Sequence, residues 1–414
     1  MKRHPFIVRL TALAALAGVL LSGCVVQETR PLAKIEARQA MQVIPDAQRL
    51  DVVVHTFDPG IPEQLADNED ALAKKRIYPE LRGAEARYFP VVLRNTLESS
   101  AQWGAVRVAP ESVQFVDLAV HGTIIEATGK RLELEITARD AAGRVWLDGK
   151  RYEGDADIGS YKTDASLKAR DPFQNVYSRI ANDLLEARNA LDAAALREVR
   201  QVAQLSFAAD LAPEALGGYV QEDKTSKPAL KRVVRLPATN DPVAQRVERI
   251  RERDAGVIDT LDGYYTGFSE QMQQAYGDFR RTSYDEIDKE DRARSSARTR
   301  TVLGAAAVLA AILVPSSCNS QSSCDLESVA RYAGTAGGIA GFLSGLQKYA
   351  DARTHAQAFG ELARSMQSEV AEQVVDVEGR SLRLTGSADE QYRQWREMLR
   401  DYKAEQAVPV NGEP

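Results

Sequence analysis

Residues 116–125, VDLAVHGTII, and residues 132–146, LELEITARDAAGRVW, decide the fold of this 414-residue chain. In the second stretch three apolar residues alternate with three polar ones: Leu132, Leu134 and Ile136 against Glu133, Glu135 and Thr137. A side-chain period of two predicts strands of a sheet that is covered on one face only. We expect strands over 115–126, 131–137 and 144–152, joined at Thr128-Gly129 and at residues 140–143, as an antiparallel meander.

One strand and one helix are expected before the meander. Residues 51–58, DVVVHTFD, form a β-branched run that Pro59-Gly60 stops, which predicts a strand ending in a turn. The apolar spacing of residues 79–99 predicts a helix that Pro90 should kink or split. With a short strand at 104–108, these elements predict a small α+β domain over residues 51–165.

Beyond this domain the apolar spacing is mainly helical. Residues 166–240 predict a helical segment that opens at Asp171-Pro172, followed by a linker rich in Pro and Gly. Asp241-Pro242 opens a long amphipathic helix, expected over residues 241–300. A helix on the order of 80 Å is too long to bury within one domain, so we expect it to pack as a coiled coil, either with its own neighbours or with other copies of the chain. Its aromatic stripe is expected to be core rather than a ligand site: Tyr264, Tyr265, Phe268, Tyr276, Phe279 and Tyr284.

Residues 350–414 predict a helix, a β-hairpin around Glu378-Gly379 and a charged C-terminal helix. Tyr392, Trp395 and Leu399 share one face of that last helix. The fold class predicted for the chain is therefore α+β, a small mixed sheet-helix domain followed by a mostly α-helical region.

The first 23 residues have the pattern of an export signal. Lys2, Arg3 and Arg9 accompany the apolar run LTALAALAGVLL at residues 10–21, which is too short to span a bilayer as a permanent helix. The run ends in Leu21-Ser22-Gly23-Cys24, which resembles the lipobox of bacterial lipoproteins.

The lipobox resemblance implies that residues 1–23 are a cleaved signal peptide and that Cys24 carries diacylglycerol and an N-acyl chain. Residues 24–50 are then a lipidated tether, and Val25, in place of Asp after the lipidated Cys, implies sorting to the outer membrane, facing the periplasm. Cleavage removes three positive charges, so the formal charge falls from −6 to −9. This acidic balance argues against a nucleic-acid partner.

Residues 301–349 predict a glycine-rich apolar helical hairpin. Residues 302–314 and 333–346 are uncharged, and between them Cys318 and Cys324 bracket a polar loop that we expect a disulfide to close. Glycine costs about 1 kcal/mol relative to Ala inside a helix, so its repetition here predicts close helix packing. The glycines concerned are Gly334, Gly337, Gly338, Gly341 and Gly345. Three interpretations remain open: a buried hairpin, a zipper for oligomerisation or membrane insertion, and a flexible linker.

The order of elements over residues 51–165, with the two quoted stretches as core, resembles the periplasmic α/β domain of curli-secretion-type lipoproteins and of lipoprotein activators of peptidoglycan synthases. The resemblance covers roughly a quarter of the chain and rests on element order. It implies binding, assembly or channel formation, and it carries over no catalytic residue. Unlike the curli-type channel lipoproteins, this sequence has no pair of long alternating strands.

Local motifs for metal, phosphate or acyl-transfer chemistry do not occur in the sequence. The three histidines after the signal, His55, His121 and His355, fall in two predicted strands and a helix. His55 and Asp58 could form a catalytic pair, and the alternative is a satisfied histidine at a strand edge. We expect no enzymatic activity, no metal site and no cofactor beyond the lipid on Cys24.

The function expected from these features is that of an outer-membrane-anchored periplasmic lipoprotein. It would act as a binding, assembly or structural component of the cell envelope, with an envelope protein or a second copy of itself as partner. The alternative is a monomeric regulator of a peptidoglycan synthase or another envelope enzyme. An envelope hydrolase is the third interpretation.

Overall fold

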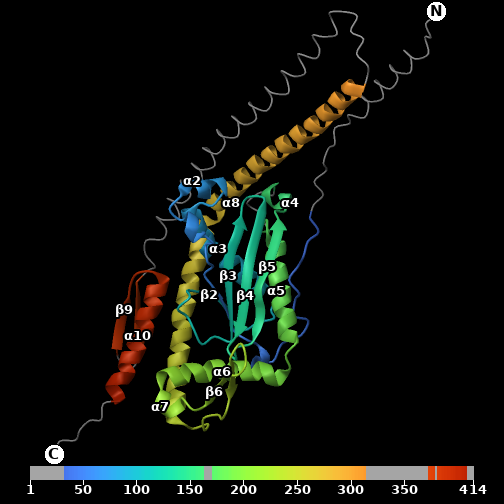
Figure 1. The fold of residues 1–414 in the computed structure, drawn as a ribbon. Coiled ribbons are helices and arrows are strands. Elements are labelled where there is room, and N and C mark those ends of the chain that lie inside the picture. Colours follow the sequence, from blue (N-terminus) through green and yellow to red (C-terminus); the bar gives the residue numbers. More distant parts are fainter. Residues whose placement is uncertain (1–31, 163–169, 314–371, 378–379, 408–414) are drawn as a thin grey trace, which may run out of the picture. The chain divides into compact units, whose positions relative to one another are not determined.

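The computed structural model describes residues 32–162, 170–313, 372–377 and 380–407. The chain divides into two compact units, Met1–Ala33 and Lys34–Pro414, and the described helices and strands lie in the second unit. Its fold is α+β, as predicted. A mixed five-stranded sheet with its helices is followed by a mainly helical region that ends in a hairpin and a helix (Figure 1).

The central sheet has the strand order β2-β1-β3-β4-β5. The strands are β1 (Val52–His55), β2 (Val106–Ala109), β3 (Leu118–Ala127), β4 (Arg131–Asp140) and β5 (Val145–Asp155). β1 runs parallel to both β2 and β3, whereas β4 is antiparallel to both β3 and β5. The predicted meander and its turn at Thr128-Gly129 are confirmed.

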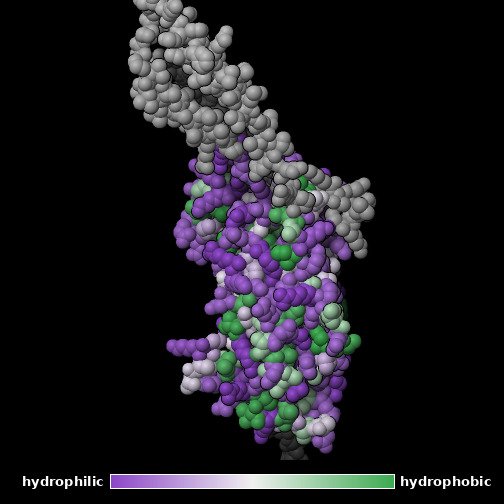
Figure 2. Space-filling view, turned by 90° about the vertical axis from the view of Figure 1, so that its right-hand side faces the viewer, coloured by the Kyte–Doolittle hydropathy of each residue, from purple (hydrophilic) through white to green (hydrophobic). Residues whose placement is uncertain are grey.

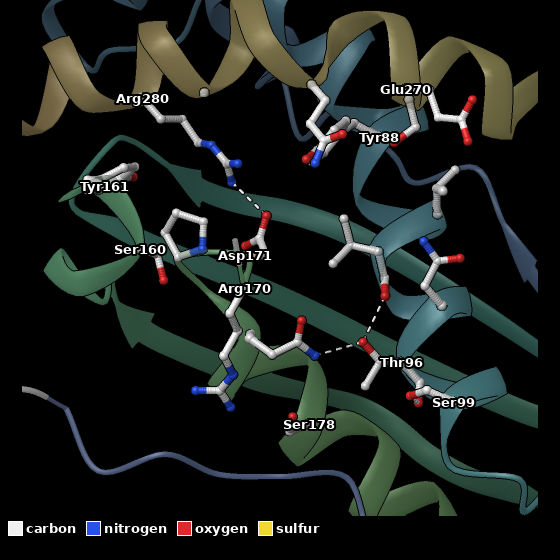
Figure 3. Close-up of a pocket in the computed structure, with 18 of the residues that line it drawn as sticks. Tyr88, Thr96, Ser99, Ser160, Tyr161, Arg170, Asp171, Ser178, Glu270 and Arg280 are labelled. Atoms are coloured by element: carbon white, nitrogen blue, oxygen red, sulfur yellow. Dashed lines mark hydrogen bonds and ion pairs between the residues drawn. The ribbon is translucent and has the colours of Figure 1, made fainter. Parts of the chain in front are cut away.

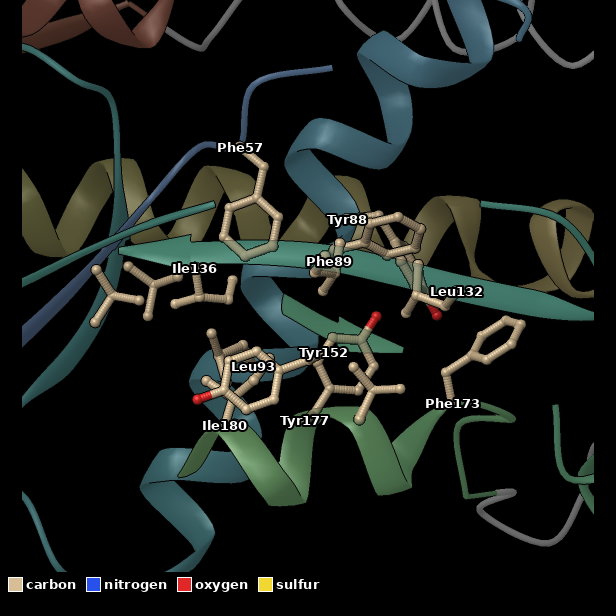
Figure 4. Close-up of a cluster of buried hydrophobic side chains, with 14 of the residues drawn as sticks. Phe57, Tyr88, Phe89, Leu93, Leu132, Ile136, Tyr152, Phe173, Tyr177 and Ile180 are labelled. Atoms are coloured by element: carbon tan, nitrogen blue, oxygen red, sulfur yellow. The ribbon is translucent and has the colours of Figure 1, made fainter. Parts of the chain in front are cut away.

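Helices α3 (Pro79–Ser99) and α5 (Gln174–Asn189) bury one face of this sheet. Every second residue of β4 from Leu132 to Ala138 is fully buried in the resulting core, which Figure 4 shows in part. The alternate residues of β4 are polar, and Arg151 of β5 pairs there with Glu133 and Glu135 at 3.5 and 3.0 Å. The pattern expected of a sheet with one apolar and one polar face is thus present.

Pro90 neither splits nor ends helix α3, which is continuous from Pro79 to Ser99. A proline has no N–H, so the carbonyl four residues earlier, that of Ala86, loses its helical hydrogen bond. The backbone N–H of Phe57, just after β1, donates to that carbonyl at 2.8 Å instead. Of the two predicted effects, a kink or a split, the split is wrong, because a neighbouring segment satisfies the orphaned acceptor.

The segment expected as one helix and a linker is more ordered than predicted. α5 is followed by a second long helix, α6 (Ala193–Leu211), which Asp192 caps by accepting a hydrogen bond from the N–H of Ala195 at 2.7 Å. A short helix α7 (Pro213–Leu216) and a hairpin of β6 (Val220–Asp223) and β7 (Leu230–Val233) replace the linker. The remaining short elements are α2 (Glu69–Lys74), α4 (Ile158–Lys162) and two 3-10 turns, Asp46–Gln48 and Glu63–Leu65.

The longest element is helix α8, which runs unbroken for 72 residues from Pro242 to Leu313. At 1.5 Å per residue it is about 108 Å long. Asp241 caps it as predicted, because its Oδ1 accepts hydrogen bonds from the N–H groups of Val243 and Ala244 at 2.9 and 3.1 Å. The helix begins where predicted and extends beyond Arg298, into the uncharged segment.

The apolar stripe of α8 packs against neighbours within this chain, which is one of the two expected arrangements, but it packs on a sheet edge and two helices rather than on a single coiled-coil partner. The stripe contacts α3, α6 and the edge strand β2. Its buried members are Val247, Ile250, Val257, Ile258, Leu261, Tyr265, Phe268, Met272 and Tyr276. Although α8 is too long to be buried along its whole length, the part that crosses β2, α3 and α6 is buried. The aromatic stripe is core, as predicted.

The C-terminal elements are the hairpin β8 (Gln373–Val377) and β9 (Arg380–Leu384) and the helix α10 (Ala388–Ala407), all as predicted. Tyr392 and Trp395 are fully buried against α8, where both donate hydrogen bonds to the carboxylate of Asp254 at 3.1 and 2.8 Å. Among the described residues, no helix combines the length and the hydropathy needed to cross a bilayer.

The turn between β3 and β4 approaches the backbone of α8 so closely that only glycine fits. A Cβ on Gly129 would lie 2.1 Å from the carbonyl oxygen of Arg280 and 2.4 Å from the nitrogen of Tyr284. We expect Gly129→Ala to lower the free energy of unfolding by about 1–3 kcal/mol, because helix or turn must shift. Urea unfolding followed by circular dichroism measures the change.

The matched control is Gly263→Ala within α8, where a Cβ would meet nothing within 4 Å. This substitution should raise the free energy of unfolding by about 0.5–1 kcal/mol, since alanine is the better helix former. Equal effects of the two substitutions would show that the close approach at Gly129 is not a constraint.

Candidate functional site

Helices α3, α5 and α8 enclose a hollow of about 960 Å³, together with the segment leading into α5 and residues 36–39 (Figure 3). We call it the three-helix hollow. Hydroxyl and amide side chains dominate its walls: Asn95, Thr96, Ser99, Gln174, Ser178, Ser269, Gln273 and Gln274. Charged residues of both signs and apolar residues such as Val91, Val92 and Pro172 complete the lining, so the hollow is mixed in polarity and has no strong net charge.

A buried ion pair crosses the three-helix hollow. Arg280 of α8 reaches toward Asp171, which precedes α5, with 3.0 Å between Nη1 and Oδ2 (Figure 3). The two side chains are only 5% and 8% exposed. The rings of Tyr276 and Tyr88 flank the guanidinium, with centroids 4.5 and 5.6 Å away. Burial by itself lowers the pKa of Arg280, but Asp171 and the tyrosine hydroxyls raise it well above its ordinary value.

A second polar contact, beside the ion pair, links α8 to α3. The hydroxyl of Tyr276 donates to Oε1 of Glu85 at 2.7 Å. Burial raises the pKa of Glu85, while nearby Arg82, 3.7 Å away, acts in the opposite direction. Burial also raises the pKa of Tyr276 well above its ordinary value. The ionisable groups around the hollow are thus held in fixed positions between the helices.

The neutral side chains of the hollow form a linked set between α5 and α3. Nε2 of Gln174 donates to Oγ1 of Thr96 at 2.9 Å, and Thr96 donates to the carbonyl of Val92 at 2.8 Å. Ser178 is 1% exposed, and its hydroxyl has no hydrogen-bond partner among the described residues. Donors and acceptors of this kind suit a polar ligand held by hydrogen bonds, so the arrangement supports binding.

The structure also brings together two histidines that the sequence leaves far apart. Val54 of β1 lies opposite Val120 of β3, so the next residues, His55 and His121, stand side by side on the same face. Their rings stack with centroids 4.4 Å apart and planes 9° from parallel. Oε2 of Glu111, after β2, is 3.1 Å from Nδ1 of His121 and 4.0 Å from Nδ1 of His55. We call these three residues the histidine cluster.

His55 and Asp58 do not form a pair, and His55 lies at the end of its strand with a hydrogen-bond partner of its own. Asp58 is engaged elsewhere: its Oδ1 accepts a hydrogen bond from the N–H of Gly60 at 2.7 Å. His55 is 2% exposed and its Nδ1 lies 3.0 Å from the carbonyl oxygen of Pro110. Burial, followed by the charge of His121, lowers the pKa of His55 to about 4.

Most predicted site residues lie outside the described residues. This holds for the lipidation site Cys24, for the disulfide pair Cys318 and Cys324, and for His355. It also holds for the packing glycines, Gly334, Gly337, Gly338, Gly341 and Gly345. These positions remain predictions.

The three-helix hollow and the histidine cluster escape motif analysis because their members are far apart in sequence. The hollow draws on helices separated by more than 170 positions, between Asn95 and Ser269. For the histidine cluster a usable signal exists, since His55 and His121 each follow a β-branched strand residue. Only the pairing of β1 with β3 turns that similarity into proximity.

No model of a protein family and no curated protein sequence matches the chain. Among solved structures, it is similar to the dodecamer of a PelC point variant from Paraburkholderia phytofirmans. The sequences are 12% identical, the match covers 37% of this chain and 96% of that chain, and the TM-score is 0.20. A similarity at this level defines neither fold nor function for this chain.

The buried pair of Arg280 and Asp171 should behave as a unit in a double-mutant cycle. Asp171→Asn keeps the oxygen that accepts the N–H of Phe173 but leaves a buried guanidinium without an anion. We expect a loss of about 3–5 kcal/mol of unfolding free energy. Adding Arg280→Met should recover most of it, because no uncompensated charge then remains.

Urea unfolding of the single and double variants measures this coupling. Asp46→Asn is the control, because its partner Arg49 and Asp46 itself are 44% and 87% exposed. An exposed pair contributes about 0–1 kcal/mol. Additive effects of Asp171→Asn and Arg280→Met would contradict the proposed coupling.

Proposed function

We propose that this chain is a lipid-anchored protein of the outer membrane, facing the periplasm, that works by binding and assembly. The observation that carries the proposal is the continuity of helix α8, which joins the sheet domain to the uncharged segment after Thr301 without a break. A domain that binds, a rigid arm and an apolar end are the parts that an assembling envelope protein needs.

Several independent contacts attach the first part of α8 to the domain. Asp262 accepts a hydrogen bond from the backbone N–H of Val108 on the edge strand β2 at 2.7 Å, and it pairs with Arg94 of α3 at 3.2 Å. Nearer its C-terminal end, Glu290 pairs with Arg76 and Asp291 with Lys130, each at 2.6 Å. The arm therefore cannot swing freely about the domain.

Beyond Asp291 the helix continues for 22 residues, or about 33 Å at 1.5 Å per residue. Its last twelve residues, Val302–Leu313, contain no charged side chain. A helix end of this composition is suited to packing against another apolar helix or to entering the surface of a membrane. The glycine-rich residues 333–346, with the spacing that predicts close packing, follow after residues 314–332.

The anchor is the sequence feature that supports an envelope location. Cys24 ends a lipobox-like stretch after an export-type leader, and acyl chains on it would hold the protein at a membrane surface. The domain surface fits that arrangement, since hydrophobic and hydrophilic residues intermingle on the face that Figure 2 shows. Val25 after the anchor supports the outer membrane as destination.

Metabolic labelling with palmitate and membrane fractionation test the anchor. The wild-type protein should carry label and sediment with outer membranes. Cys24→Ser should abolish labelling, because serine offers no thiol for the lipid. Val25→Asp is the matched control, since it should keep the label but move the protein to inner-membrane fractions. Equal labelling of the Cys24→Ser protein would exclude the lipid anchor.

Light scattering of the detergent-solubilised mature protein tests assembly. We expect an oligomer for the wild type and a monomer for Gly341→Leu, since a bulky side chain prevents close helix contact. Gly341→Ala should retain the oligomer, because alanine still permits close approach. A monomeric wild-type protein would contradict assembly and would favour the monomeric regulator of an envelope enzyme.

A further inference from the structure

We infer that the histidine cluster, His55, His121 and Glu111, is a binding site for a divalent transition-metal ion of the Zn²⁺ type. The site lies on the polar face of the sheet, apart from the three-helix hollow and from helix α8. Its existence does not depend on anchoring or assembly.

The pairing of β1 with β3 brings the two histidines together, so their proximity is determined by the fold. Because Val54 lies opposite Val120, His55 and His121 leave adjacent strands at the same level and on the same side. Glu111 joins them from the loop after β2, which is the other neighbour of β1. One ligand atom from each residue can be chosen so that all three lie within 4.8 Å of one another.

To fit one ion, the distances contract slightly and the exposed ring of His121 rotates out of the stack, because the lone pair of an imidazole lies in its ring plane. With bonds of about 2.0–2.1 Å, two ligands of a tetrahedral Zn²⁺ lie about 3.3 Å apart. Nδ1 of His121 and Oε2 of Glu111 already lie 3.1 Å apart, and Nδ1 of His55 is 4.0 Å from the same oxygen. In the free protein Nδ1 of His55 donates its hydrogen bond to the carbonyl oxygen of Pro110 at 3.0 Å.

The exposure of two of the three side chains allows this adjustment. His55 is buried and held in place, whereas the side chains of His121 and Glu111 are 38% and 71% exposed. His121 and Glu111 can therefore move toward an ion that is bound to the buried His55. Ion binding at Nδ1 of His55 would replace the hydrogen bond to Pro110, and in the metal-bound form each imidazole would carry its proton on Nε2.

The chemistry of the donor set selects the class of ion. Two imidazoles and one carboxylate are the ligands found in zinc sites that keep an open position. Ca²⁺ and Mg²⁺ prefer oxygen ligands, and Cu(I) prefers thiolate or thioether ligands. A borderline divalent ion such as Zn²⁺ is therefore the expected occupant.

The surroundings of the cluster set the expected strength of binding. A hollow of about 490 Å³ beside it gives an ion access from solvent, and Arg139 and Lys231 also line this hollow. Their positive charges oppose the approach of a cation. We therefore expect a dissociation constant in the micromolar range rather than the tighter binding of a structural zinc site.

Calorimetric titration of ZnCl₂ into the metal-stripped, detergent-solubilised mature protein, prepared without a polyhistidine tag, tests the site. We expect one equivalent to bind and Ca²⁺ or Mg²⁺ not to compete. His121→Ala and Glu111→Gln should each weaken Zn²⁺ binding at least tenfold, because each removes one ligand. Both residues are exposed enough that these substitutions should not prevent folding.

Glu135→Gln is the matched control. Glu135 lies on the same sheet face in β4 and pairs with Arg151 at 3.0 Å, outside the cluster, so Zn²⁺ affinity should be unchanged. X-ray absorption of the zinc-loaded wild type provides a readout that needs no variant, and two imidazole ligands are expected. Absence of saturable zinc uptake, affinity unaffected by His121→Ala and Glu111→Gln, or a spectrum without imidazole would each overturn the inference.

Discussion

β1 is only four residues long, yet it lies between β2 and β3 and pairs in parallel with both. Parallel pairing cannot be made by a tight turn, so the chain must leave the sheet and return after each pairing. Helix α3 is the excursion between β1 and β2, and it becomes the main cover of the apolar face. All four residues of β1 are buried as a result.

The same pairing determines where the other features can lie. β2 is left at the edge of the sheet, and α8 covers that edge, with Asp262 bonding to the N–H of Val108. An edge strand capped by a helix is protected from pairing with other chains. On the opposite side of β1, its pairing with β3 places His55 beside His121. Val52 and Val54 on one face of this short strand thus belong to the core, whereas His55 on the other face belongs to the histidine cluster.

The sequence predicts those elements whose signals are local. Alternation identifies β3 to β5, the apolar spacing identifies α3 with its observed limits, and Asp241-Pro242 marks the start of α8. The boundary between α5 and α6 is missed because only Ala190, Leu191 and Asp192 separate the two helices, without a Pro or Gly. The three-helix hollow and the histidine cluster depend on contacts between distant residues, which periodicity does not contain. The packing partner of α8 is not predicted for the same reason, since its apolar stripe does not reveal which surface it meets.

The hydrogen bond from Phe57 to the carbonyl of Ala86 couples the helix and the sheet more tightly than apolar packing would. Because Pro90 has no N–H, α3 by itself lacks one backbone hydrogen bond. Phe57, just after β1, supplies the donor for it. Separating α3 from the sheet would leave the carbonyl of Ala86 without its hydrogen-bond donor, at a cost comparable to that of a lost hydrogen bond. The two elements should therefore open together in hydrogen exchange, as a single cooperative unit instead of a helix that frays from a stable sheet.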